Sequence, residues 1–139
     1  MCKDTYKTIL WLYSDDKDSG STNQDCSFLL SKPIENIKSF KLKNIQVDES
    51  GLTLYGLKVG SNALSSLTTD RIVTSANTSD IVFDVDLNYG TMDEITYNCQ
   101  RAKLHKVDIK IYDQSGTSLL GLGSKVWAMA IEFECEHYN

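Results

Sequence analysis

Residues 126–135 read VWAMAIEFEC, and the alternation in this stretch defines the fold class. Large apolar or sulfur-containing side chains occupy every second position, namely Trp127, Met129, Ile131, Phe133 and Cys135. Because successive side chains of a β-strand point to opposite faces, these residues share one face of a strand. The other face carries alanines and then glutamates, which predicts close packing against the alanines and an exposed end at the glutamates.

Outward from this stretch, three further segments have the pattern of strands. Residues 80–87 (DIVFDVDL) and 104–112 (LHKVDIKIY) alternate between apolar and polar positions, as expected for strands with one face in water. Residues 6–13 (YKTILWLY) are apolar on both faces. This pattern predicts a central strand that is covered on both sides.

Shorter or less regular segments complete the set. Residues 26–30 are short and apolar, and residues 52–59 make a weaker strand. The apolar side chains of residues 37–47 change face near Lys43, which predicts a β-bulge. Residues 94–100 fit either an eighth strand or a short helix.

Evidence for helices is thin. Residues 63–71 predict a single helical turn, whereas polar loops at 14–25, 68–79 and 113–124 separate the strands. Gly116 closes the sequence DQSG as the last residue of a predicted tight turn. Short strands joined by polar loops predict an all-β sandwich or barrel, in one domain that covers residues 1–139.

The composition narrows the classes of partner. The chain has 139 residues and a net charge of −5, so nucleic acid is not expected to be the main partner. No apolar run reaches the ~18–20 residues of a membrane span, and no signal peptide is expected. The four cysteines lack CxxC spacing and are expected to be reduced, with Cys26 and Cys135 as small core residues.

The sequence offers no motif for catalysis, a metal ion or another cofactor. Its two histidines, His105 and His137, lie next to no nucleophile signature and are expected at the surface. Cys135 and His137 form a lone pair, whereas zinc takes four ligands. We therefore expect a protein that is not an enzyme.

Two blocks of sequence carry a resemblance to a known family. The first block comprises residues 13–18 (YSDDKD), 27–30 (SFLL) and 33–42 (PIENIKSFKL). The second comprises residues 107–116 (VDIKIYDQSG), followed by Trp127 and residues 131–133 (IEF). Together they resemble the single-jelly-roll penton and minor capsid proteins of large double-stranded DNA viruses, virophages and polinton-like elements.

The resemblance implies a fold, a function and partners. The fold would be a single jelly-roll β-sandwich of about eight antiparallel strands with long polar loops. The function would be that of a penton or minor capsid subunit, which forms pentamers and contacts the major capsid protein. Such a protein is made in the host cytoplasm and resides in the virion. A tail, fibre or decoration module of a virus or phage is the first alternative.

The expected subunit contacts are charged. Lys38, Lys41 and Lys43 are expected to face acidic residues of a neighbouring subunit, with Glu132 and Glu134 as further contacts. The simpler interpretation is that these lysines, and the basic cluster at 101–110, sit on solvated strand faces or pair with the acidic end of the same chain.

A ligand-binding sandwich, such as a carbohydrate module, is the second alternative. It would need exposed aromatic side chains, for which the candidates are Trp11, Tyr55, Tyr89, Tyr97 and Tyr112. Both tryptophans, however, lie in apolar strand patterns, so Trp11 and Trp127 are expected in the core.

Overall fold

The computed structural model describes residues 4–48, 56–68, 81–86, 91–92, 95–116 and 118–137. Its strands, in chain order, are β1 (Thr5–Tyr13), β2 (Asp25–Val47), β3 (Gly56–Gly60), β4 (Ile81–Asp86), β5 (Thr91–Met92), β6 (Tyr97–Tyr112) and β7 (Trp127–Glu136). A 3₁₀ turn, η1 (Ser14–Asp16), follows β1, and a short helix, α1 (Asn62–Leu67), follows β3.

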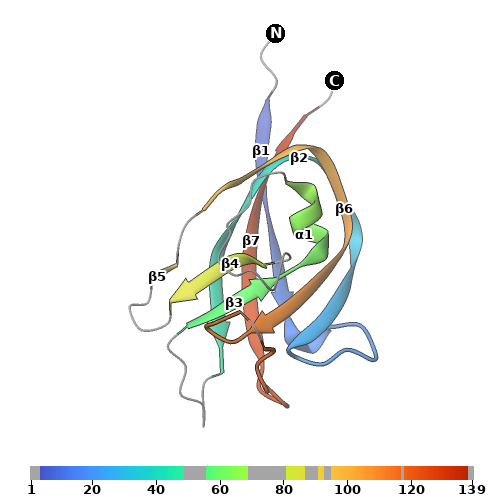
Figure 1. Cartoon of the computed structure of the whole chain (residues 1–139). Helices are drawn as coiled ribbons and strands as arrows, with labels where there is room; N and C mark the ends of the chain where they lie inside the picture. The colour runs from blue at the N-terminus through green and yellow to red at the C-terminus, as the bar shows by residue number, and fades with distance from the viewer. Residues whose placement is uncertain are drawn as a thin grey trace.

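The strands form one antiparallel sheet in the order β1-β7-β2-β6-β3-β4-β5 (Figure 1). Since β5 has two residues, six longer strands make up the sheet. The sheet is not closed: β1 lies at one edge and β5 at the other. The start of β1 lies beside the end of β7, because residues 5–13 pair with residues 128–136 (Figure 1).

The two long strands, β2 and β6, divide their pairing between two parts of the sheet. The first part of β2, at 25–29, pairs with β6 at 106–110, and the end of β6, at 110–112, pairs with β3. The later part, at 37–47, pairs with β7 on one side and, at its start, with residues 97–102 of β6 on the other. Register shifts lie between these parts, and Figure 1 shows β2 and β6 curving together over one end of the molecule.

The bend has a local cause in the backbone. Asn36 in β2 and Arg101 in β6 have φ angles of 56° and 46°. A residue in this left-handed region interrupts the extended conformation and redirects the strand. Because both residues lie between the two halves of their strands, β2 and β6 turn at the same level of the sheet.

The bent sheet encloses the core. Phe40 of β2 packs against Phe83 of β4, with ring centroids 6.2 Å apart, although two other strands separate β2 from β4 in the sheet order. Phe28 and Trp127 make a similar contact at 5.9 Å. The Tyr97 hydroxyl donates a hydrogen bond to the Val82 carbonyl. The two parts of the sheet therefore face each other across one apolar interior.

Several sequence predictions are confirmed. All five alternating residues of β7 are buried, with exposures between 0 and 2%. Cys26 and Cys135 are buried as well. A register shift between Leu42 and Asn44 marks the predicted bulge, and the Gly116 N–H donates to the Asp113 carbonyl at 3.0 Å in the predicted turn.

The predicted helical turn is α1, which packs against β6. Its first backbone N–H groups, at Asn62 and Ala63, donate to the carboxylate of Asp108 on β6 at 2.9 and 2.8 Å. Ser61 caps the same turn by accepting from the Leu64 N–H. A six-residue helix is too short to be stable alone, so these hydrogen bonds and the burial of Leu64 hold it in place.

Two of the strand predictions are wrong. The segment at 6–13 is the edge strand β1, not a central strand, and Trp11 is 52% exposed instead of buried. The segments at 26–30 and 37–47 are one continuous strand, β2, because the chain bends between them without leaving the sheet. For the segment at 94–100 the strand alternative is confirmed, because residues 97–100 begin the long strand β6. The predictions for residues 52–55, 69–80 and 87–90 lie outside the described residues.

Candidate functional site

A charged surface covers the outer face of β7 and its neighbours. Ile131 and Phe133 point into the core, so the alternate residues Glu132 and Glu134 face outward. In the adjoining strand β2, Lys41 lies directly opposite Glu132. This surface therefore contains four of the five charged residues that were expected at a subunit contact, namely Lys41, Lys43, Glu132 and Glu134.

Glu132 is the centre of this surface. Its carboxylate forms ion pairs with Lys7 at 3.4 Å and with Lys43 at 3.6 Å. Partial burial by itself would raise the pKa of Glu132, but the hydrogen bond and charge of Lys7 and the charges of Lys43 and Lys41 outweigh it and lower the pKa below the usual 4.5. Glu132 is thus a carboxylate at neutral pH, bridging β1 and β2 across β7.

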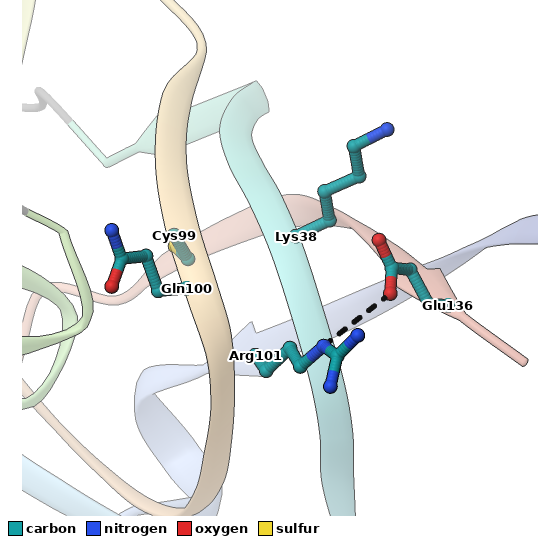
Figure 2. Close-up of a pocket in the computed structure, with 5 residues that line it drawn as sticks. All are labelled: Lys38, Cys99, Gln100, Arg101 and Glu136. Carbon is teal, nitrogen blue, oxygen red and sulfur yellow. Dashed lines mark ion pairs between the residues drawn. The ribbon is translucent and has the colours of Figure 1, made fainter. Parts of the chain in front are cut away.

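Glu134 and Lys38 are placed differently. The Ser39 hydroxyl donates to the Glu134 carboxylate at 3.4 Å. Lys38 is exposed and lines a hollow of about 440 Å³ between β2, β6 and the end of β7 (Figure 2). The lining of this hollow is completed by Cys99, Gln100, Arg101 and Glu136.

The hollow holds two cations and one carboxylate. Arg101 Nε lies 3.8 Å from Glu136 Oε2, and Figure 2 shows the guanidinium reaching from β6 across β2 to this carboxylate. The Cys99 thiol contacts the Tyr97 carbonyl at 3.9 Å, and no histidine is among the lining residues that could serve as its base. This arrangement is suited to binding an acidic group by charge.

Cys26 and Cys135 are buried thiols, whereas His105 and His137 are exposed, as predicted. Burial raises the pKa of Cys26 to about 12 and also raises the pKa of Cys135. Both groups are therefore protonated thiols at neutral pH and poor nucleophiles. The His137 ring packs on Tyr6, with centroids 4.3 Å apart. Among the described residues, no three His, Cys, Asp or Glu side chains gather as metal ligands would.

The structure brings together some of the residues selected from the sequence. Lys43 pairs with Glu132 and Arg101 pairs with Glu136, as the simpler interpretation of pairing within one chain expects. Lys38 lies apart from Lys43, in the hollow beside Arg101. Contact of any of these residues with a second subunit stays a prediction.

Sequence reasoning missed the exposed aromatic side chains of β1. Trp11 and Tyr13 are 52% and 47% exposed on the outer face of this strand. Of the other aromatic candidates, Tyr97 and Tyr112 are buried, and residues 55 and 89 lie outside the described part of the chain. Trp11 and Tyr13 are two residues apart and therefore share one face of the strand. Because the opposite face is apolar as well, the sequence pattern does not indicate which face is buried.

Comparisons with known proteins add no relative. Searches against protein-family models and against curated proteins found no match to this chain. Within the described ranges, no helix has the length and apolar character needed to cross a membrane.

Proposed function

We propose that this protein is a structural subunit of a viral capsid, a penton or minor capsid protein with a jelly-roll fold. One observation carries the proposal, namely the way β2 and β6 divide their pairing. If each of these strands is counted as two segments, one group reads β1-β7-β2-β6 and the other reads β2-β6-β3-β4. Eight antiparallel segments in two facing groups of four match the layout of a jelly roll, which capsid proteins use widely.

The sequence blocks support the same proposal independently. Residues 33–42 form the bend of β2 and the start of its second half, and residues 107–116 form the second half of β6 and the turn after it. These are the strands that the two groups share. The resemblance therefore falls on the part of the chain that organises the sheet.

An apolar flank offers a surface for a neighbouring subunit. At the flank where β1 and the first half of β2 are both at a sheet edge, Tyr6, Ile9 and Leu30 line a groove of about 310 Å³. Leu29, next to the groove in sequence, is 69% exposed. Exposed apolar side chains that gather in one place favour association, because burial removes them from water. We propose that this β1–β2 flank, together with the hollow lined by Lys38 and Arg101, contacts the next subunit of a ring.

The oligomeric state tests the proposal. Native mass spectrometry and negative-stain imaging of the purified chain should give a closed ring with five times the 15.6 kDa of one chain. Leu29→Asp should reduce the ring to monomers, because a carboxylate at the flank would have to be desolvated on contact. The matched control is Leu119→Asp, another exposed leucine. Leu119 pairs with Tyr112 at the end of β6, six residues along this strand from Lys106, which lies opposite Leu29.

The outcomes separate the two assembly candidates. A ring of another closed symmetry would overturn the penton and favour a tail, fibre or decoration module. A monomer would require imaging of the assembled particle, and a position away from the shell would contradict the capsid proposal.

A further inference from the structure

The outer face of β1 presents two neighbouring aromatic rings to solvent. Trp11 and Tyr13 lie two residues apart on the strand, with ring centroids 6.4 Å apart and planes inclined by 14°. Both are about half exposed. Neither ring serves the core, whose tryptophan is Trp127 on the opposite face of the sheet. Packing in the core therefore does not explain why these two aromatic residues are present on β1.

A hollow adjoins the pair and runs across three strands. Tyr13 on β1 lies opposite Ala128 on β7, which in turn lies opposite Gln46 on β2. These three residues line a hollow of about 310 Å³. Neighbouring strands are about 4.8 Å apart, so the aromatic side and the amide side are separated by about 10 Å. The small alanine leaves room between them for one flat ring.

The next step along the strands repeats the arrangement. Trp11 lies opposite Ala130, which lies opposite Asn44. At this step Ala130 is buried, with 2% exposure, so the open floor of the trough is at Ala128. Trp11 and Asn44 extend the aromatic side and the amide side beyond the hollow. Asp15 lines the hollow at the end of the trough and adds a carboxylate. We define this feature, comprising Trp11, Tyr13, Asn44, Gln46 and Ala128, as the aromatic–amide trough.

We propose that the aromatic–amide trough binds a neutral saccharide. A sugar ring has a face of C–H groups that packs on an aromatic side chain, and its edge carries hydroxyls that both donate and accept hydrogen bonds. Tyr13 and Trp11 supply the apolar contact, and the Gln46 and Asn44 amides supply donors and acceptors on the facing side. Binding pockets of this kind combine apolar walls with a few polar groups that fix orientation.

The charges near the trough help to define the ligand. Its nearest lining charges, Asp15 and Asp48, are acidic and exposed, which disfavours an anionic sugar. A cationic peptide gains little from such exposed carboxylates, because water and salt screen the interaction. The aromatic and amide side chains of the trough are uncharged, and they suit a neutral polyhydroxy ring. This inference goes beyond the assembly role and does not depend on it.

A glycan array probed with the purified chain is the first experiment. We expect binding to neutral glycans and none to sialylated or sulfated ones. The best neutral oligosaccharide is then titrated by isothermal calorimetry against Trp11→Ala and Tyr13→Ala, each of which should weaken binding by about tenfold or more. Gln46→Ala tests the amide side without changing the aromatic pair.

Leu29→Ala is the matched control, since Leu29 is exposed but lies outside the trough. Its affinity should stay within about twofold of the unmodified chain. The chain's oligomeric state is measured for every variant. Loss of assembly without loss of saccharide binding in Leu29→Asp would place the two functions on separate surfaces.

Three outcomes would overturn the proposal. The first is an array without any neutral hit. The second is unchanged affinity in both Trp11→Ala and Tyr13→Ala. The third is that the trough behaves as a contact for protein. This would be seen if both variants abolish assembly, or if an arginine tripeptide binds while its uncharged citrulline counterpart does not.

Discussion

The two tryptophans make the sharpest contrast in this molecule. Trp11 on β1 and Trp127 on β7 lie in neighbouring strands and in similar apolar sequence, yet one is 52% exposed and the other 2%. Trp127 faces the interior, where its indole N–H donates to the Asn23 carbonyl at 2.6 Å and its ring meets Phe28. Trp11 faces away from the interior on the edge strand. An apolar strand pattern therefore does not establish which face of a strand is covered.

The largest expected effect on stability comes from removing the buried tryptophan, Trp127. Trp127→Ala should lower the free energy of unfolding by about 3–5 kcal/mol, because it leaves a cavity between β7 and β2 and removes an indole hydrogen bond. Urea unfolding followed by circular dichroism measures the loss. A loss below about 1 kcal/mol would show that the ring is not part of the core.

A smaller effect isolates the hydrogen bond of the buried ring. Trp127→Phe keeps an aromatic ring but removes the N–H that the Asn23 carbonyl accepts. We expect a loss of about 1–3 kcal/mol, since the carbonyl is left without this donor in a buried site. Comparing urea midpoints of the Phe and Ala variants separates the hydrogen bond from the packing of the ring.

The charged outer face should respond to pH. Glu132→Gln is expected to cost no more than about 1 kcal/mol at neutral pH, because Lys7 and Lys43 are partly exposed. The pKa of Glu132 is lowered in the folded chain, so its contribution is complete above about 4.5, the usual value, and disappears as the pH falls through the lower folded value. The stabilities of the wild type and of Glu132→Gln should therefore converge as the pH falls, which thermal unfolding of both proteins between pH 7 and 3 measures.

A difference between wild type and Glu132→Gln that grows on acidification would contradict the ion pairs. Lys106→Gln provides a control on the same kind of exposed surface, because Lys106 takes part in none of the ion pairs described above. Its unfolding free energy should follow that of the wild type across the pH range.

The smallest effect concerns the exposed ring. Trp11→Ala should change the free energy of unfolding by no more than about 0.5 kcal/mol, as for most surface substitutions. Acrylamide should quench the tryptophan fluorescence of the wild type mainly at Trp11, and this quenching should largely disappear in the variant. A destabilisation close to that of Trp127→Ala would mean that the two faces of the sheet are equally important to folding.

Much of the fold was predictable because it depends on local pattern. The alternation in β7, the bulge near Lys43, the turn ending at Gly116 and the helical turn that became α1 each follow from a few consecutive residues. The edge position of β1 did not follow, because it depends on which strands pair. The ion pair of Lys43 with Glu132 was foreseen as an intrachain alternative, whereas the aromatic–amide trough joins three strands and was not predicted.

The sequence by itself determined an all-β protein with a buried face on β7, since side-chain alternation and turn residues act over a few positions. Only the tertiary structure decided that β2 and β6 bend and pair on two sides, which brings Phe83 onto Phe40. It also decided that Trp11 stays in solvent. The physical reason is that burial depends on the order in which distant strands hydrogen-bond, and this order minimises exposed apolar surface over the whole chain instead of strand by strand.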